Sequence, residues 1–225
     1  MQKLALIAGL ALVSVLGGGW TTPILAQQSK LSASSDPSEL WAFVKRLDAR
    51  IKTDPQAKYF ASKGQCLEWL GKLKQAGIEY SKAIKRAPSS RDYFIARARV
   101  LRRQNQLLAA EEDYTRAIEL GDETVEGYGG RGMCRLGLKS YEGAIEDADR
   151  AIALGSTESE DWYVKGSSLY HLGKLDSALV YLNTALKMRP NDAGYLRARA
   201  QMLLKLGRTK ESKADSERAH RLDGR

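Results

Sequence analysis

The chain has 225 residues, of which 43% are hydrophobic and 28% charged, and its formal net charge is +9. This length allows one sizeable core or a short repeat array without excluding two domains, and the basic balance favours acidic partners such as nucleic acid, anionic lipid or acidic peptides. The two histidines, His171 and His220, have no Cys, Asp or Glu cluster at ligand spacing, which argues against a metal site.

Residues 1–26 have the layout of a secretory signal peptide. A lysine precedes an apolar run from Leu4 to Leu16, and Ala26 is the expected last residue before cleavage. The alternative is an uncleaved membrane anchor, because weak apolar character continues to Leu25 and would reach the roughly 20 residues of a membrane span. Three glycines, two threonines and a proline interrupt that stretch, so the pattern favours cleavage and a periplasmic or secreted protein.

Cleavage would remove Lys3 and no acid, so the net charge would fall from +9 to +8. No cysteine follows the apolar run, so nothing indicates a lipid anchor. Residues 27–36 are polar and serine-rich, which predicts a flexible leader. Export also makes nucleic acid the least favoured of the acidic partners.

A capping helix is predicted within residues 37–56. Asp36 or Ser35 is a suitable N-cap and Pro37 a suitable first helical residue. One apolar stripe then continues toward an Asp-Pro pair that ends the helix; it consists of Leu40, Val44, Leu47 and Ile51.

The rest of the chain repeats every 34 residues without insertion or deletion. The period appears first in two columns of alanine: Ala76, Ala110, Ala144 and Ala178, and Ala83, Ala117, Ala151, Ala185 and Ala219. The rows cover 57–90, 91–124, 125–158, 159–192 and 193–225. Apolar residues recur at intervals of three and four within each half-row, which predicts helix, short turn, helix.

The rows agree where two helices would have to touch. The fourth place is bulky and apolar: Phe60, Phe94, Tyr128, Trp162 and Leu196. The eighth place is always small: Gly64, Ala98, Gly132, Gly166 and Ala200. Small residues at the eighth place allow two helix backbones to approach closely.

These rows resemble tetratricopeptide repeats, in which a bulky residue, small residues, alanines and a final proline occupy these places. Row four is the closest match, with Trp162, Gly166, Ala178, Ala185 and Pro190 in their family places. The resemblance implies an all-α fold, a right-handed α-solenoid of stacked helix-turn-helix units with an N-terminal capping helix. The seventh place departs from the family because it is always basic, and rows two, three and five lack the final proline.

The basic seventh place consists of Lys63, Arg97, Arg131, Lys165 and Arg199. The residues sixteen places later are Glu79, Asp113, Asp147, Tyr181 and Asp215. Ion pairs between the two helices of a repeat explain both columns better than a ligand-binding stripe does. The acids could instead pair three residues on with Lys82, Arg116, Arg150 and Arg218.

In the family the first helix of each repeat lines a concave surface, so the resemblance implies a partner-binding groove. The candidate groove residues include a cationic patch and an aromatic wall; they are Gln65, Trp69, Ile95, Arg99, Arg102, Arg103, Met133, Tyr163, Ser167, Tyr170, His171, Arg197 and Gln201. Arginine and aromatic side chains often anchor binding surfaces. The alternative is a solvated basic face. The pattern does not match the family's carboxylate clamp, so that ligand is not predicted.

Cys66 and Cys134 occupy the same place two rows apart. Stacked helices would separate them by roughly 20 Å or more, well beyond the ~7 Å between Cα atoms that a disulfide allows. The sequence therefore predicts two free thiols in a packed interior.

The stretch EGYGGRGMCRLG at 126–137 contains G-x-G-x-x-G, the spacing of a dinucleotide-binding turn, at Gly127, Gly129 and Gly132. Such a turn follows a strand, whereas a predicted helix and a short turn precede this stretch. The extra glycines predict a weak helix, in which Gly129 and Gly130 either admit a ligand near the backbone or soften the repeat. Replacing both with alanine should then stiffen the array.

Leader, capping helix and repeats account for the chain after residue 26, and no nucleophile is paired with a base. The favoured hypothesis is a non-enzymatic, exported protein–protein interaction module without a cofactor, which binds an acidic peptide or helix of a partner as a scaffold or assembly factor. A membrane-tethered scaffold with an uncleaved N-terminal anchor is the alternative. An enzyme or a nucleic-acid reader is less well supported by the residues.

Overall fold

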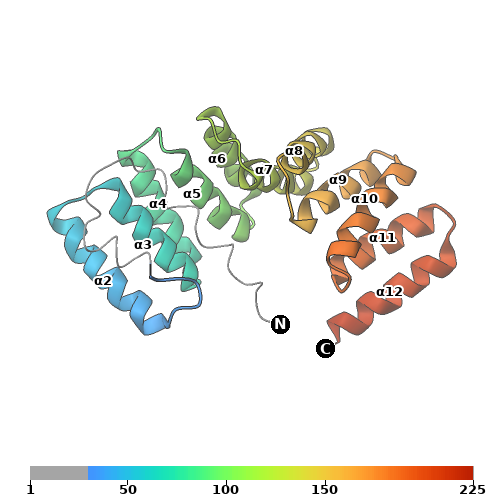
Figure 1. Cartoon of the computed structure of the whole chain (residues 1–225), viewed down its shortest axis with the longest axis horizontal. Coiled ribbons are helices and arrows are strands. Elements are labelled where there is room, and N and C mark those ends of the chain that lie inside the picture. The colour runs from blue at the N-terminus through green and yellow to red at the C-terminus, as the bar shows by residue number, and fades with distance from the viewer. Residues whose placement is uncertain (1–29, 225) are drawn as a thin grey trace. The chain divides into compact units, whose positions relative to one another are not determined.

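The computed structural model describes residues 30–224, all of whose regular structure is helical (Figure 1). The predicted signal peptide, residues 1–26, lies outside the described part of the chain. The eleven helices of the described residues are α2 (Pro37–Thr53), α3 (Ala57–Trp69), α4 (Leu73–Arg86), α5 (Arg91–Arg103), α6 (Leu107–Glu119), α7 (Val125–Gly137), α8 (Tyr141–Ala153), α9 (Ser159–His171), α10 (Leu175–Met188), α11 (Ala193–Lys205) and α12 (Thr209–Asp223). The all-α prediction is confirmed, and the first residue of every 34-residue row is the first residue of a helix.

Helix α2 begins with a side-chain cap. The Asp36 carboxylate accepts a hydrogen bond from the Ser38 backbone N–H at 2.7 Å, and Pro37 occupies the first turn, where its missing N–H costs nothing. The apolar stripe of α2 packs against Tyr59 and Cys66 of α3, through Leu40, Phe43, Val44 and Leu47. The first repeat helix is therefore covered on its outer side.

A residue in the left-handed region ends the first helix of each pair. Gly71, Gly173 and Gly207 have φ between 70° and 76°, and Asn105 and Lys139 take the same role at φ 58° and 64°. Glycine adopts this conformation without a Cβ penalty, which explains three of the five turns.

The rows that lack a final proline end differently from those that have one. In rows two and three, Gly121 (φ 87°) and Gly155 (φ 82°) terminate the second helix. In rows one and four, Pro88 and Pro190 follow soon after the ends of α4 and α10. A glycine in the left-handed region and a proline both stop a helix, so the two kinds of row keep the same period.

The small eighth place is explained by close helix packing. A Cβ added at Gly166 would lie 3.1 Å from the Ala178 carbonyl oxygen and from the Leu182 backbone nitrogen. A Cβ added at Gly64 would lie 3.0 Å from the Tyr80 ring. Both distances are shorter than an ordinary van der Waals contact, so these helices pack at a spacing that a larger side chain would widen.

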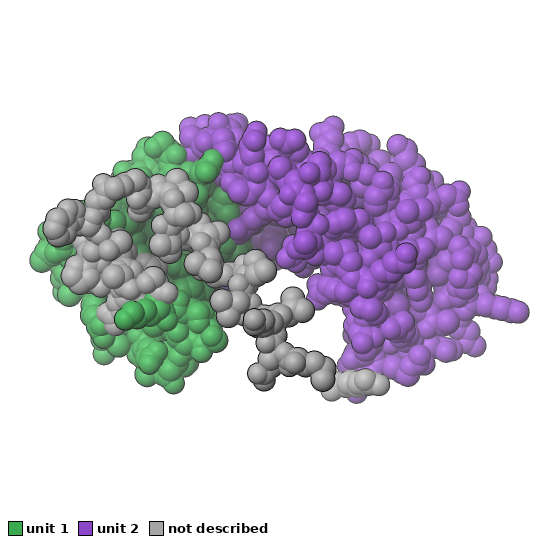
Figure 2. Space-filling view, in the orientation of Figure 1, with its two compact units in different colours: residues 1–100 green, residues 101–225 purple. Residues whose placement is uncertain are grey.

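The chain divides into two compact units, residues 1–100 and 101–225 (Figure 2). Within unit 2, α7 packs against α8, α9 packs against α7 and α10, and α11 packs against α10 and α12. Among the described residues, no helix is both long and apolar enough to span a membrane.

Both cysteines are buried and free, which confirms the prediction of two separate thiols. Burial raises the pKa of the Cys66 thiol to about 12 and that of the Cys134 thiol to about 11. Cys134 is also influenced by Arg102, which lowers its pKa, and by Glu111 and Asp147, which raise it. Because the thiolate is the reactive form, both thiols are protonated and unreactive at neutral pH.

Candidate functional site

Unit 2 contains a pocket of about 200 Å³, lined mainly by the first helices of three successive rows. Helix α9 contributes four lining side chains and lies between contributions from α7 and α11, while α10 supplies one residue from the second-helix layer. The lining residues are Leu136, Tyr163, Ser167, Tyr170, His171, Leu182, Ala198, Gln201 and Met202.

The α9 side of the pocket follows helical periodicity. Tyr163, Ser167 and Tyr170 are spaced by four and three residues, so they lie on one face of the helix. The pocket therefore has a tyrosine at each end of a single helix face, with a hydroxyl between them.

Ser167 is the unusual polar group of the pocket. The residue is 8% exposed, and its Oγ has no hydrogen-bond partner among the described residues. A buried hydroxyl without a partner costs free energy, and most such groups in proteins are paired. The Oγ atom is itself closed to solvent, so it is an unpaired buried group beside the pocket and is not presented to a ligand inside it.

Neighbouring rings hold the aromatic wall in place. Tyr163 stacks on Tyr195 with ring centroids 4.7 Å apart, and His171 stacks on Tyr141 at 4.6 Å. The Lys205 ammonium lies 4.4 Å from the centroid of the Tyr170 ring. These contacts order both ends of the wall and place a cation beside one of them.

A family model for the tetratricopeptide repeat matches residues 95–159 and 163–220, which is more than half of the chain. The chain belongs to the tetratricopeptide repeat (TPR) family. Proteins with this fold are typically non-catalytic modules for protein–protein interaction. No curated protein matches this TPR chain.

Solved TPR structures share the fold at low sequence identity. A tetratricopeptide repeat protein from Parabacteroides merdae has a TM-score of 0.70 and 19% identity, covering 88% of this chain and 77% of its own. YrrB, described as a TPR protein with an unusual peptide-binding site, has a TM-score of 0.65 and 18% identity, covering 78% and 91%. MamA from Desulfovibrio magneticus has a TM-score of 0.66 and 14% identity, covering 74% and 94%.

The pocket brings together five of the candidate groove residues, namely Tyr163, Ser167, Tyr170, His171 and Gln201. Sequence reasoning assigned no binding role to Leu182, Ala198 or Met202. The positions equivalent to Leu182 and Met202 are buried in most rows. The side chains at these positions differ in size from row to row, and that variation is the one sequence signal that a hollow is left between the helices.

The other candidates from unit 1 are more enclosed. Trp69 packs against the α2 core, and Ile95 is 8% exposed. The Arg99 guanidinium contacts the carboxylate of Glu68 through Nε at 2.9 Å and Nη2 at 3.2 Å, and Glu68 is 7% exposed. Arg99 therefore neutralises a buried acid of its own chain. The positive charge of the predicted cationic patch is smaller at this position than the sequence indicates. Gln65 is half-buried.

The remaining candidates lie in unit 2, outside the pocket lining. Met133 packs against the core formed by Ala144, Ala148 and Val164. Arg197 forms an ion pair with Asp223. Arg103 is exposed, whereas Arg102 is half-buried and its Nε has no hydrogen-bond partner among the described residues.

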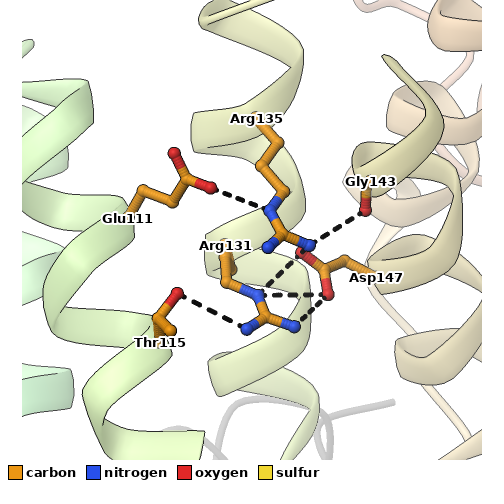
Figure 3. Close-up of polar contacts among 6 residues, drawn as sticks. All are labelled: Glu111, Thr115, Arg131, Arg135, Gly143 and Asp147. Atoms are coloured by element: carbon orange, nitrogen blue, oxygen red, sulfur yellow. Dashed lines mark hydrogen bonds and ion pairs between the residues drawn. The ribbon is translucent and has the colours of Figure 1, made fainter. Parts of the chain in front are cut away.

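The basic seventh place of the TPR rows is structural. In row three, Arg131 contacts Asp147 through Nη2 at 2.7 Å and Nε at 2.9 Å (Figure 3). Arg135 joins the same carboxylate at 3.0 Å and reaches Glu111 of α6 at 2.9 Å. Figure 3 shows both guanidinium groups on α7 between the neighbouring helices, where they connect α6 to α8. Sequence reasoning missed Arg135, which lies one helical turn after Arg131.

Other rows repeat this arrangement with variations. The predicted pair forms in row one between Lys63 and Glu79 at 3.4 Å, and in row five between Arg199 and Asp215 at 2.7 Å. The alternative pair of Glu79 with Lys82 also forms, at 2.9 Å. These pairs support the structural interpretation of the basic column.

In two rows the basic residue at the seventh place also contacts the second helix of the preceding row. Lys165 pairs with Asp149 and lies over the Tyr181 ring at 4.2 Å, and the Arg97 guanidinium donates to Ser81 Oγ at 3.0 Å. Row four therefore keeps its cation, although the acid lies sixteen residues before it instead of after it.

The glycine-rich stretch lies inside α7, and the element before it is the helix α6, so this spacing does not form a dinucleotide-binding turn. The idea that these glycines leave room for a ligand is wrong. A Cβ at Gly130 would lie 2.6 Å from Tyr114 Oη, and one at Gly129 would lie 2.6 Å from Asp161 Oδ1. Side chains of the same chain already occupy that space, and the glycines are required for this packing.

Proposed function

We propose that this TPR chain is a non-enzymatic, exported interaction module that binds a peptide or helix of a partner protein and acts as a scaffold or assembly factor. The observation that carries the proposal is the α7–α9–α11 pocket, because it is a concave, part-aromatic site on the first-helix layer of the repeats. The description of YrrB as having a peptide-binding site is consistent with a peptide as the ligand.

The proposed partner is acidic. The net charge of +9 favours such a partner, and Lys205 lies at one end of the pocket wall. Arg99 is a poor test of this idea, because its replacement by glutamate would place two carboxylates together at the buried Glu68. Lys205 and Arg103 are exposed and provide a cleaner test.

The test is affinity capture with the protein expressed from its full-length sequence, followed by mass spectrometry. Tyr170→Ala and Gln201→Ala alter the pocket, and Val180→Ala, an exposed position on α10 that is 61% accessible, is the matched control. We expect the pocket variants to lose a partner that the wild type and the control retain. Lys205→Glu should weaken capture of the same partner, and added salt should reproduce that effect. Equal capture by all variants would refute the proposed binding surface.

Export is the second element of the proposal, and it rests on the apolar run and the Ala26 site. N-terminal sequencing of the protein from its native cells tests it. A mature chain that begins at Gln27 supports export with cleavage. An intact Met1 in a membrane fraction would instead support the tethered scaffold.

A further inference from the structure

We propose that unit 1 binds the surface of an anionic phospholipid bilayer through the outer face of α4. In this arrangement Lys74, Lys82 and Lys85 lie against the headgroups, and Ile78 inserts between them. The inference goes beyond the proposed function, because it concerns another unit and another class of partner than the pocket does.

The net positive charge of the chain lies entirely in unit 1. Residues 30–100 contain 15 lysines and arginines against seven acids, whereas residues 101–225 contain 20 basic and 20 acidic residues. Two of the seven acids, Glu68 and Glu79, are buried and paired within unit 1. In unit 2 the attraction for an anion rests on local cations such as Lys205. A large anionic surface is therefore attracted to unit 1.

Helix α4 concentrates this charge on its outer face. Lys74, Ile78, Lys82 and Lys85 follow one another at intervals of four, four and three residues, so they lie on one side of the helix. All four residues are exposed, and Ile78 is 55% exposed. Neither Lys74 nor Lys85 forms an ion pair within the described residues. The face is a row of three lysines about 17 Å long, with an isoleucine inside it.

The repeat fold does not require this charge. The second helices α6 and α8 each have one basic residue and four acids, whereas α4 has four basic residues and one acid. In α12 the basic and acidic residues are equal in number. The same four places hold Leu108, Glu112, Arg116 and Glu119 in α6, Glu142, Glu146, Arg150 and Ala153 in α8, and Asp176, Val180, Thr184 and Lys187 in α10. The lysine face is thus a property of α4 alone among these four helices.

The residue types favour a bilayer over a single carboxylate ligand. Lysine is a point charge without the planar fork with which arginine holds one carboxylate, and several lysines together suit an anionic lipid surface. Ile78 gains nothing from a carboxylate, whereas apolar side chains beside lysines are typical of helices that lie in the headgroup region.

A second helix of unit 1 has the same combination of side chains. Helix α2 exposes Trp41, which is 39% exposed, together with Lys45 and Lys52. Tryptophan is enriched where proteins meet the membrane–water interface. Unit 1 therefore combines cations and exposed apolar side chains on two of its helices.

The N-terminal segment joins the described chain at unit 1. Leu31 packs against the α2 core, and the apolar run from Leu4 to Leu16 precedes it in the sequence. Either form of the predicted segment, a signal peptide during export or a retained anchor, brings unit 1 to a bilayer before unit 2. The basic unit is therefore the one nearer to lipid along the chain.

The test is sedimentation of the full-length protein with vesicles. One set contains phosphatidylglycerol and phosphatidylcholine in equal amounts, and the other contains phosphatidylcholine alone. The neutral set records any binding by the apolar residues 4–16, which does not depend on lipid charge. We expect partitioning onto the anionic vesicles to be about 100-fold stronger, the effect of three lysines near an anionic surface.

Two pairs of variants locate the contact. Lys74→Glu with Lys85→Glu should weaken binding to anionic vesicles at least about 25-fold. Lys187→Glu with Lys210→Glu is the matched control, because it makes the same charge change at the same two places of rows four and five.

The second pair tests the apolar contact. Ile78→Ser should weaken binding to anionic vesicles about 3- to 10-fold. Val180→Ser, at the same place of row four and 61% exposed, should leave that binding unchanged. Circular dichroism spectra equal to that of the wild type show that the variants are folded.

Equal partitioning onto anionic and neutral vesicles would overturn the inference, and so would an equal loss in the two double-lysine variants. Binding of soluble polyglutamate that depends on Lys74 and Lys85, with no effect of Ile78→Ser on vesicles, would assign the face to an acidic protein instead. The proposed function has a separate readout, because the pocket variants change unit 2 only. Partner capture without vesicle binding removes this inference alone, and vesicle binding with equal capture by all pocket variants removes the proposed function alone.

Discussion

Gly130→Ala is predicted to destabilise the protein, although alanine is ordinarily the better helix former. The new Cβ would lie 2.6 Å from Tyr114 Oη and 2.7 Å from Tyr114 Cε1, and Tyr114 is 1% exposed. Ordinary carbon contacts begin near 3.5 Å, so the ring or the helix must move by about 1 Å. A buried ring has no free space into which it can move.

The magnitude is a balance of two effects. Overpacking a core costs about 1 to 3 kcal/mol, and the complete burial of Tyr114 favours the upper end. Replacing a helical glycine with alanine recovers about 0.5 to 1 kcal/mol. The expected net loss is about 2 kcal/mol of unfolding free energy, which lowers the Tm by roughly 4 to 8 °C in a chain of this size.

The assay is thermal unfolding followed by far-UV circular dichroism, arranged as a double-mutant cycle with Tyr114→Leu. Removing the ring should abolish most of the cost of Gly130→Ala, giving a coupling energy well above 0.5 kcal/mol. Gly194→Ala is the control, because it is exposed on α11 and its Cβ would meet only Asp192 Oδ1, at 3.1 Å. A higher Tm for Gly130→Ala, as for an ordinary helix position, would refute this account of the glycine-rich stretch.

Two further predictions concern buried acids. Asp147→Asn should cost about 3 kcal/mol or more of unfolding free energy, because it leaves Arg131 and Arg135 without the buried carboxylate between them. Urea denaturation measures this loss. The control is Glu119→Gln, in an exposed pair with Arg116, which should change the unfolding free energy by less than about 1 kcal/mol. Burial raises the pKa of Asp161 above its ordinary 3.8, so the folded chain holds that proton more tightly than the unfolded chain. The contribution of Asp161 to the unfolding free energy should therefore fall as pH rises from 3.8 through its folded-state pKa. The difference in unfolding free energy between the wild type and Asp161→Asn should change with pH over this range, and a difference that is constant with pH would contradict the assignment.

The start of α2 and of the first helix of each row could be read from the sequence because the signals are local. Pro37 follows an aspartate that caps α2, and the rows begin at Ala57 and Val125, where α3 and α7 begin. A period without insertions keeps every later row in register, so one correctly placed helix determines the others. The buried, unpaired cysteines follow from the same register, since places two rows apart cannot meet.

The site was only partly predictable because it depends on side chains from different rows. The register put Tyr163 and Tyr170 on the first-helix layer, but the hollow between them also requires Leu182 and Met202, which belong to other helices. The same holds for Gly130, whose missing side chain matters only because Tyr114 of another helix fills the space.

The sequence by itself determined the all-helical repeat, its period and the starts of α2 and of the first helix of each row, because capping, turn chemistry and apolar periodicity act over a few residues. Only the tertiary structure decided that Arg99 forms an ion pair with Glu68, that Ser167 Oγ is buried without a hydrogen-bond partner among the described residues, and that a pocket opens beside Ser167. The physical reason is that charge balance and free volume depend on how neighbouring helices fill the space between them, and that space is not encoded in any single repeat.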